Sequence, residues 1–168
     1  MASEKVLEAK KARVAELTQM IEKSVSCVLV DYKGISVADD TKLRRELREA
    51  GVYYVVEKNS ALRFALTAAG HASLAQHLDG TTAIALSEND QTAPARILGK
   101  YSENLKEVFN LKAGYVEGEN FDAAGILALS KIPSKDVLLS QLVGSLQGPI
   151  QKLAATLQAV VDNQTEAA

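Results

Sequence analysis

The chain has 168 residues, with 19 basic and 21 acidic side chains and a formal net charge of −2. Hydrophobic residues make up 47% of it, enough for a folded core, which excludes wholesale disorder and favours one compact domain with an appendage. The net charge of the whole chain is near neutral and so gives no general electrostatic attraction to nucleic acid. Most of the basic residues lie in the first half with acids between them, so any basic patch must be built by folding.

The cysteine content and the hydropathy pattern indicate where in the cell the protein is expected. Cys27 is the single cysteine and lies in an apolar run, so no internal disulfide can form and a reducing environment is favoured. No apolar run approaches the ~18 residues of a membrane span, and the first residues lack the apolar stretch of a secretion signal. We therefore expect a cytoplasmic protein that has no membrane partner.

The first three quarters of the chain alternate helical and strand patterns. Apolar residues spaced three and four apart predict helices, and short β-branched runs predict strands. The predicted helices cover residues 5–22, 36–50, 60–69, 90–103 and 122–130, and the predicted strands cover 24–30, 52–56, 82–86 and 108–116. This alternation predicts an α/β fold, with α+β left open, in which helices cross over a four-stranded sheet. The pattern does not give the strand directions.

A different pattern begins after Pro133, where Ser134 can cap a new helix. We expect a domain at residues 1–132 and a helical spine at 133–168. Apolar residues from Val137 to Val161 recur three, four or one apart, which places them on one stripe of a helix. Gly148-Pro149 interrupts this stripe, so a kink or a fresh helix start is expected there. Such a stripe must be buried on its own domain or on a partner.

Catalytic and cofactor signatures are missing from the sequence. It has no glycine-rich dinucleotide or nucleotide loop and no nucleophile elbow. His71 and His77 are six residues apart, on different faces of a helix, and no cysteine accompanies them, so a zinc site is not expected. Asp31 ends the first strand, where α/β enzymes often keep functional acids. A small enzyme or phosphoacceptor domain using Asp31, with Glu57 and Lys58 nearby, is the alternative to a non-catalytic scaffold. A homodimer held by the terminal helix is a third reading.

Basic residues gather near the ends of the first two predicted strands. Lys33 and Gly34 follow the first strand, Lys58 and Asn59 follow the second, and Arg63 lies one turn further. If the two strands are neighbours, these residues emerge at the same edge of the sheet, which would suit phosphate contacts. The competing interpretation is an ordinary charged surface, in which neighbouring glutamates pair with these cations.

Six segments, spread along essentially the whole chain, carry a resemblance in their order and spacing: Val28–Val37, Leu43–Val52, Val55–Ser60, Gly80–Ala85, Gly114–Gly118 and Ile132–Ser134. Together they resemble the bacterial ribosomal protein L-ten family, the base of the large-subunit stalk. Two departures stand out. Thr81 occupies a position where the family often has proline, and Glu57 one where a basic residue or valine is commoner. An acid at Glu57 is expected to weaken or redirect a phosphate contact at Lys58.

The resemblance implies a structural ribosomal protein rather than an enzyme, with no cofactor. Its α/β domain would bind 23S rRNA beside ribosomal protein L-eleven. Its terminal helix would carry dimers of the acidic stalk protein L-seven/L-twelve, which recruit GTP-bound translation factors. The expected rRNA-binding residues are Lys33, Gly34, Arg45, Lys58, Asn59 and Arg63. The expected stalk-protein-binding residues are Ile150, Leu153, Leu157, Val160 and Val161.

Overall fold

The computed structural model describes the backbone of residues 4–105 and 109–166, and the side chains of residues 6–105 and 109–160. The chain divides into two compact units, residues 1–132 and residues 133–168. Each unit is described by itself.

The first unit is built on one antiparallel sheet. Its strands are β1 (Ser26–Asp31), β2 (Val52–Val56), β3 (Ala83–Ser87), β4 (Asn110–Val116) and β5 (Glu119–Asp122). They lie in the order β2-β3-β1-β4-β5, and every neighbouring pair is antiparallel. The mixed helix-and-strand class is confirmed, in its α+β form because the sheet is antiparallel.

The predicted strand count of four is wrong because β5 was missed. This strand reads Glu-Asn-Phe-Asp, with one apolar residue in four, so it has neither the alternation nor the β-branched content that marks a strand. A tight turn at Glu117 and Gly118, both with positive φ, folds it back against β4. Pairing with β4, rather than its own composition, makes this segment a strand.

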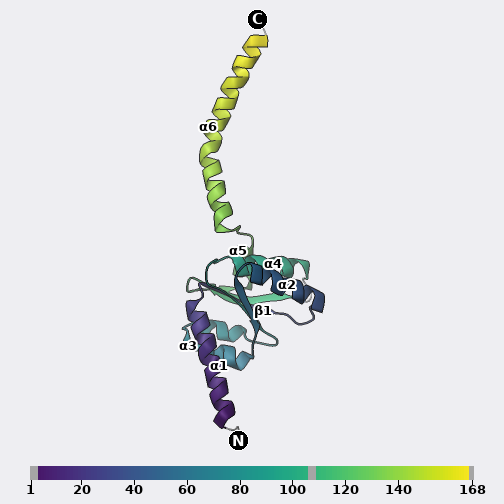
Figure 1. Cartoon of the computed structure of the whole chain (residues 1–168), viewed down its shortest axis with the longest axis vertical. Coiled ribbons are helices and arrows are strands. Elements are labelled where there is room, and N and C mark those ends of the chain that lie inside the picture. The colour runs from purple at the N-terminus through teal and green to yellow at the C-terminus, as the bar shows by residue number, and fades with distance from the viewer. Residues whose placement is uncertain (1–3, 106–108, 167–168) are drawn as a thin grey trace. The chain divides into compact units, whose positions relative to one another are not determined.

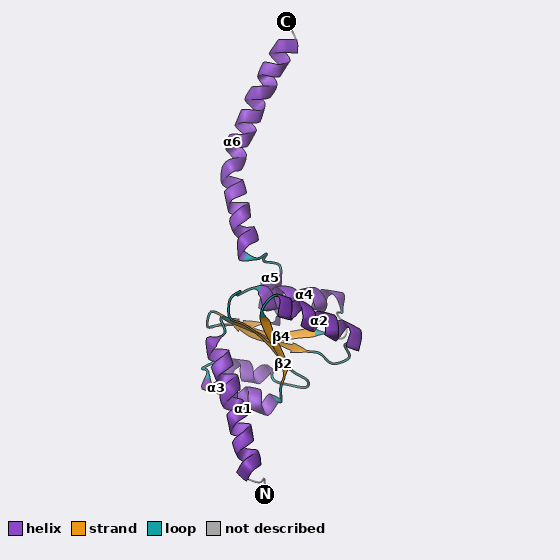
Figure 2. Cartoon of the chain, viewed as in Figure 1, coloured by secondary structure: helices purple, strands orange, loops and turns teal. Residues whose placement is uncertain are grey.

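Helices cover both faces of the sheet (Figure 2). They are α1 (Glu4–Lys23), α2 (Val37–Glu49), α3 (Asn59–Ala68), the short 3-10 helix η1 (Ala72–His77), α4 (Ala93–Asn104) and α5 (Ala123–Ser130). The predicted helix starts agree within three residues. Ser36 is the N-cap residue of α2, since its hydroxyl accepts a hydrogen bond from the Asp39 N–H.

Each face of the sheet has its own core. Helices α2, α4 and α5 cover one face, where Leu43 and Leu47 pack against Val28 and Val30 of β1. On the other face, α1, α3 and η1 supply residues such as Leu17. Strand β1 is buried on both faces, which fits its apolar run.

The second unit is a single helix, α6 (Lys135–Glu166), with Pro149 inside it. The helix continues through Pro149 instead of starting afresh, and Figure 1 shows that it bends part-way along. Its large apolar side chains are all exposed where described, from 43% for Leu138 to 71% for Ile150. None of the helices described has the combination of length and apolar content needed to cross a membrane.

Candidate nucleic-acid interface and partner-binding helix

The basic residues after β1 and β2 emerge at the same end of the sheet, but not from neighbouring strands. Both strands pair antiparallel with β3, which lies between them, so β1 and β2 run in the same direction. The condition that the two strands be neighbours is therefore not met. Lys33 and Lys58 nevertheless follow strand ends on one side of the sheet, with the segment that leads into β3 between them.

A hollow lies at this end of the sheet. It is lined by Tyr32, by residues 56–60 at the start of α3, and by residues 80–82 before β3. Lys58 is exposed and is the N-cap residue of α3, but its side chain makes no capping hydrogen bond. The first N–H groups of a helix carry partial positive charge and suit an anion. Together with Lys58 they make the hollow suitable for a phosphate.

Asn59 links two of the segments that form this hollow. Its side-chain amide donates hydrogen bonds to the carbonyl oxygens of Leu78 at 3.1 Å and Gly80 at 2.7 Å. Both amide hydrogens are therefore used within the protein. Asn59 holds the segment before β3 against the start of α3, a positioning role that its place in the sequence did not reveal.

Asp31 belongs to a second group of hydrogen bonds at the same end of the sheet. Its carboxylate accepts hydrogen bonds from the Thr81 hydroxyl and, at 3.2 Å, from the Lys33 N–H. Lys112 of β4 donates to the Thr81 carbonyl at 2.6 Å and the Thr82 hydroxyl at 2.9 Å. Burial lowers the pKa of Lys112, against the opposing effect of Asp31 and Asp79. Asp31 thus joins β1 to the segment before β3, and Thr81 supplies a hydroxyl that proline would lack.

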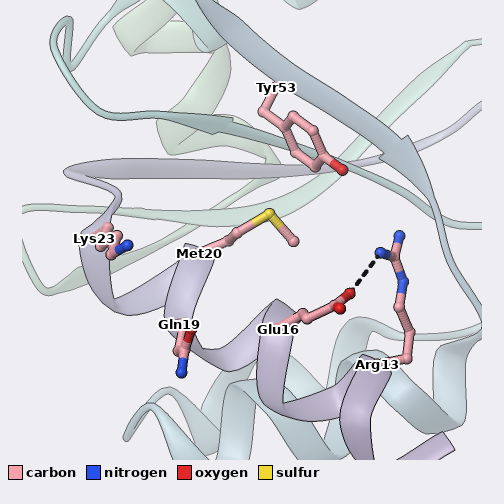
Figure 3. A pocket seen from close by; sticks show the side chains of 6 residues that line it. All are labelled: Arg13, Glu16, Gln19, Met20, Lys23 and Tyr53. Atoms are coloured by element: carbon pink, nitrogen blue, oxygen red, sulfur yellow. Dashed lines mark hydrogen bonds and ion pairs between the residues drawn. The ribbon is translucent and has the colours of Figure 1, made fainter. Parts of the chain in front are cut away.

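Glu57 does not stand beside Lys58 as a free acid. Its carboxylate accepts a hydrogen bond from Nε of Arg13 at 2.9 Å and forms an ion pair with the same guanidinium. Arg13 also bonds Glu16 at 3.1 Å, the contact drawn in Figure 3. These carboxylates, Glu57 first, raise the pKa of Arg13. Arg13 compensates the negative charge of Glu57. Glu57 should therefore weaken a phosphate contact at Lys58 less than the sequence alone suggested.

The ion pairs separate the predicted basic residues into two groups. Arg45 binds Glu49 at 2.9 Å, and Arg44 binds Asp40 at 2.8 Å, as expected for pairs four residues apart on a helix. Among the described side chains, no carboxylate forms an ion pair with Lys33, Lys58 or Arg63. The ordinary-surface interpretation therefore fits Arg45, while the other three cations keep their charge for a ligand.

Sequence reasoning missed Phe64, which is 68% exposed on α3. The signal was present, because Leu62, Ala65 and Leu66 define the buried face of this helix and Phe64 falls outside it. An exposed aromatic side chain one residue after Arg63 is typical of binding surfaces.

The remaining singled-out residues have structural contacts. His71 stacks on Tyr115, with 4.1 Å between ring centroids, and its Nδ1 lies 3.1 Å from the Asn120 side-chain oxygen. His77 lies 3.7 Å from Asp122 of β5. Cys27 is buried in β1, and this burial raises the pKa of its thiol, as fits a small core residue.

The second candidate site is the apolar stripe of α6. Ile150, Leu153, Leu157 and Val160 are spaced three, four and three apart, so they share one face, and each is more than half exposed. The side chain of Val161 lies outside the described ones. The preceding half of the helix, residues 137–146, has the same exposed character.

Comparison with known proteins gives a consistent match over nearly the whole chain. Residues 5–103 match the family described as "Ribosomal protein L10", and residues 132–168 match the "Ribosomal protein uL10 C-terminal region". The chain is 43% identical over 162 residues to the large ribosomal subunit protein uL10 of Shouchella clausii, and 41% identical over 162 residues to that of Alkaliphilus metalliredigens. Both alignments cover 96% of this chain and 97% of the relative. The chain therefore belongs to the uL10 family of large ribosomal subunit proteins.

Proposed function

We propose that this large-subunit protein anchors the ribosomal stalk by binding 23S rRNA with its first unit and dimers of the acidic stalk protein L-seven/L-twelve with α6. In this arrangement ribosomal protein L-eleven is its neighbour on the rRNA, and the dimers are presented to GTP-bound translation factors. The observation that carries the proposal is the division of the chain. In the folded unit Lys33, Lys58 and Arg63 form no ion pair with a described side chain, and an exposed apolar stripe runs along α6.

The rRNA interface consists of the hollow at the end of the sheet and its surroundings. Lys33, Lys58 and Arg63 contact backbone phosphates, because their charges are not taken up by carboxylates. Gly34, with φ of 92°, lets the backbone turn sharply after β1 and approach the ligand closely. Asn59 positions the hollow, and Arg45 contributes less because Glu49 already binds it. Such contacts read the position and shape of the RNA rather than its base edges.

A salt titration tests the rRNA interface. Replacing Lys58 with alanine should weaken binding to the stalk-base RNA and reduce the slope of log affinity against log salt by about 0.7–0.9 for the lost phosphate contact. Lys100 of α4 is the matched control, because it is also an exposed lysine but lies on a helix that does not line the hollow. An unchanged slope for Lys58→Ala would remove this residue from the interface.

The stalk-protein site consists of Ile150, Leu153, Leu157, Val160 and Val161 on the second half of α6. An amphipathic helix that lays its apolar face into a hydrophobic groove uses anchors at this spacing. Burial of Leu or Ile side chains contributes about 1.5–3 kcal/mol each before ordering and association costs are subtracted. The stripe therefore supplies the gross driving force for holding a partner with a complementary groove.

A charge placed on the stripe tests the stalk-protein site. Leu153→Asp should sharply reduce co-purification of the acidic stalk protein. Ala155→Asp adds the same charge two residues away, on the opposite face by helical geometry, and should retain the dimers. Equal loss in both variants would mean that helix stability, not the apolar stripe, governs the interaction.

A further inference from the structure

The outer face of α3 carries an aromatic side chain that the fold does not use. Phe64 is 68% exposed, while Leu62, Ala65 and Leu66 on the other face are fully buried. Ser60 lies one turn before Phe64 on the same outer face, and Arg63 is adjacent to it. Exposing a phenyl ring to water in this way brings no benefit to folding, so the ring is available to a ligand.

The chain segment that contains Phe64 has no acidic residue. From Lys58 to Leu78 there is no aspartate or glutamate in 21 residues, although the whole chain contains 21 acids in 168. This segment includes all of α3 and η1. Arg63 and Lys58 have no ion-pair partner among the described side chains. The segment that carries Phe64 therefore opposes a polyanion with no acidic side chain of its own.

We propose that Phe64 is a stacking platform for an unpaired base of the bound RNA, with Arg63 and Lys58 holding the phosphates on either side. This inference rests on the proposed rRNA binding and adds to it a base contact that phosphate recognition alone does not require. Unstacked bases of loops and bulges are recognised on exposed aromatic rings beside cationic side chains. A groove on another protein is the competing partner, but the absence of acids along this segment favours RNA.

Conservative substitutions at Phe64 separate stacking from simple apolar contact. Phe64→Leu keeps an apolar side chain of similar size without the aromatic ring, and Phe64→Tyr keeps the ring. We expect Phe64→Leu and Phe64→Ala to weaken binding of the full chain to the stalk-base RNA by about 5- to 150-fold, the range that loss of one stacked base produces. Phe64→Tyr should bind like the wild type. The salt slope should stay the same in all three, since no charge is removed.

A spectroscopic readout follows from the composition of the chain, which contains no tryptophan. Phe64→Trp therefore introduces a single indole at the proposed stacking position. RNA should quench its fluorescence as the base stacks on the ring. Tyr53→Trp is the matched control, because Tyr53 is 46% exposed but belongs to β2 and lines a hollow with residues of α1 (Figure 3). Its fluorescence should change little.

The two proposals fail in different ways. If the wild type binds the RNA and Lys58→Ala lowers the salt slope, but Phe64→Leu binds normally and Phe64→Trp is not quenched, the rRNA interface stands and the stacking platform is wrong. If Phe64→Leu binds naked RNA normally but is poorly incorporated into ribosomes, the ring faces a protein and the inference is also overturned. If the wild type itself does not bind the RNA, the proposed function fails.

Discussion

The two units of this protein use the same apolar residue types in opposite ways. In the first unit, side chains such as Leu47 and Leu66 are fully buried between the sheet and its helices. In the second unit, Leu153 and Leu157 have the same chemistry and are about 60% exposed. Helices in proteins owe most of their stability to the packing of an amphipathic face. The first unit therefore supplies its own packing, while the long helix α6 has a face suited to packing supplied by a partner.

The same contrast appears among the charged residues. Within the first unit, Arg13, Asp31 and Lys112 are tied into ion pairs and hydrogen bonds that hold its segments together. Lys58 and Arg63 have no such partner among the described residues. Paired groups thus maintain the fold, and unpaired groups are the candidates for ligand contact.

The largest expected effect comes from truncating one leucine in each unit. Leu47→Ala should lower the free energy of unfolding of the first unit by about 2–5 kcal/mol, because it leaves a cavity in the core. Leu153→Ala should change that value by less than about 0.5 kcal/mol, because its side chain is exposed. Chemical denaturation of both variants provides the measurement. A similar loss of stability in both would show that the stripe of α6 packs within the isolated chain.

Adding a methyl group should have opposite effects in the two units. A Cβ at Gly114 of β4 would clash with the Cys27 carbonyl oxygen, so Gly114→Ala should destabilise the first unit by about 1–3 kcal/mol or more. A Cβ at Gly144 of α6 meets no described atom within 4 Å, and Gly144→Ala should favour the helix by about 1 kcal/mol. Thermal unfolding and helical circular dichroism measure the two effects. The contrast would be broken if both substitutions were neutral.

Removing the side-chain amide of Asn59 tests whether this residue holds the fold together or contacts the ligand. Asn59→Ala loses two hydrogen bonds to backbone carbonyls and should cost about 1–3 kcal/mol of stability. RNA affinity should fall because the hollow loosens, while the salt slope stays constant because no charge is lost. Weaker RNA binding at full stability would instead assign Asn59 to direct contact.

The smallest expected effect concerns Tyr54, whose buried hydroxyl has no hydrogen-bond partner among the described residues. Tyr54→Phe removes this unpaired group and should stabilise the protein at neutral pH by roughly 1 kcal/mol.

The same substitution predicts a change at alkaline pH. Burial, with a smaller contribution from Asp40, raises the pKa of Tyr54 to about 12, above its unfolded value of about 10. The folded state therefore favours the neutral phenol over the phenolate. The part of the unfolding free energy that comes from this preference is fully present below pH 10 and is lost as the pH rises toward 12. Unfolding free energies measured from pH 9 to 12 should fall less steeply for Tyr54→Phe. Parallel curves for the two proteins would contradict the assigned pKa.

Local patterns predicted the helices and four strands well, because apolar spacing and capping residues act within a few positions of each other. Strand β5 was missed because a partner strand rather than its own composition makes it a strand. The resemblance to the uL10 family is confirmed. So is the expectation it implied of a structural, non-catalytic protein of the large ribosomal subunit.

The details of the candidate site lay beyond local patterns. The pairing of Arg13 with Glu57 joins residues 44 positions apart, and the bonds from Asn59 reach residues 19 and 21 positions away. Sequence spacing does not reveal such contacts, and they changed the roles of Glu57 and Asn59.

We also predict that the interruption at Gly148-Pro149 acts as a hinge within α6. Pro149→Ala should restore a backbone hydrogen-bond donor and stiffen α6, which interdomain mobility measurements can check.

The division of labour between the two units is tested most directly by deleting residues 150–168 and measuring both interactions on the same sample. Native mass spectrometry of the truncated chain, mixed with stalk-base RNA and the acidic stalk protein, gives both readouts. The account predicts a complex with RNA at wild-type affinity and no bound stalk dimers. Stalk dimers that remain bound to the truncated chain, or RNA binding lost together with them, would contradict it.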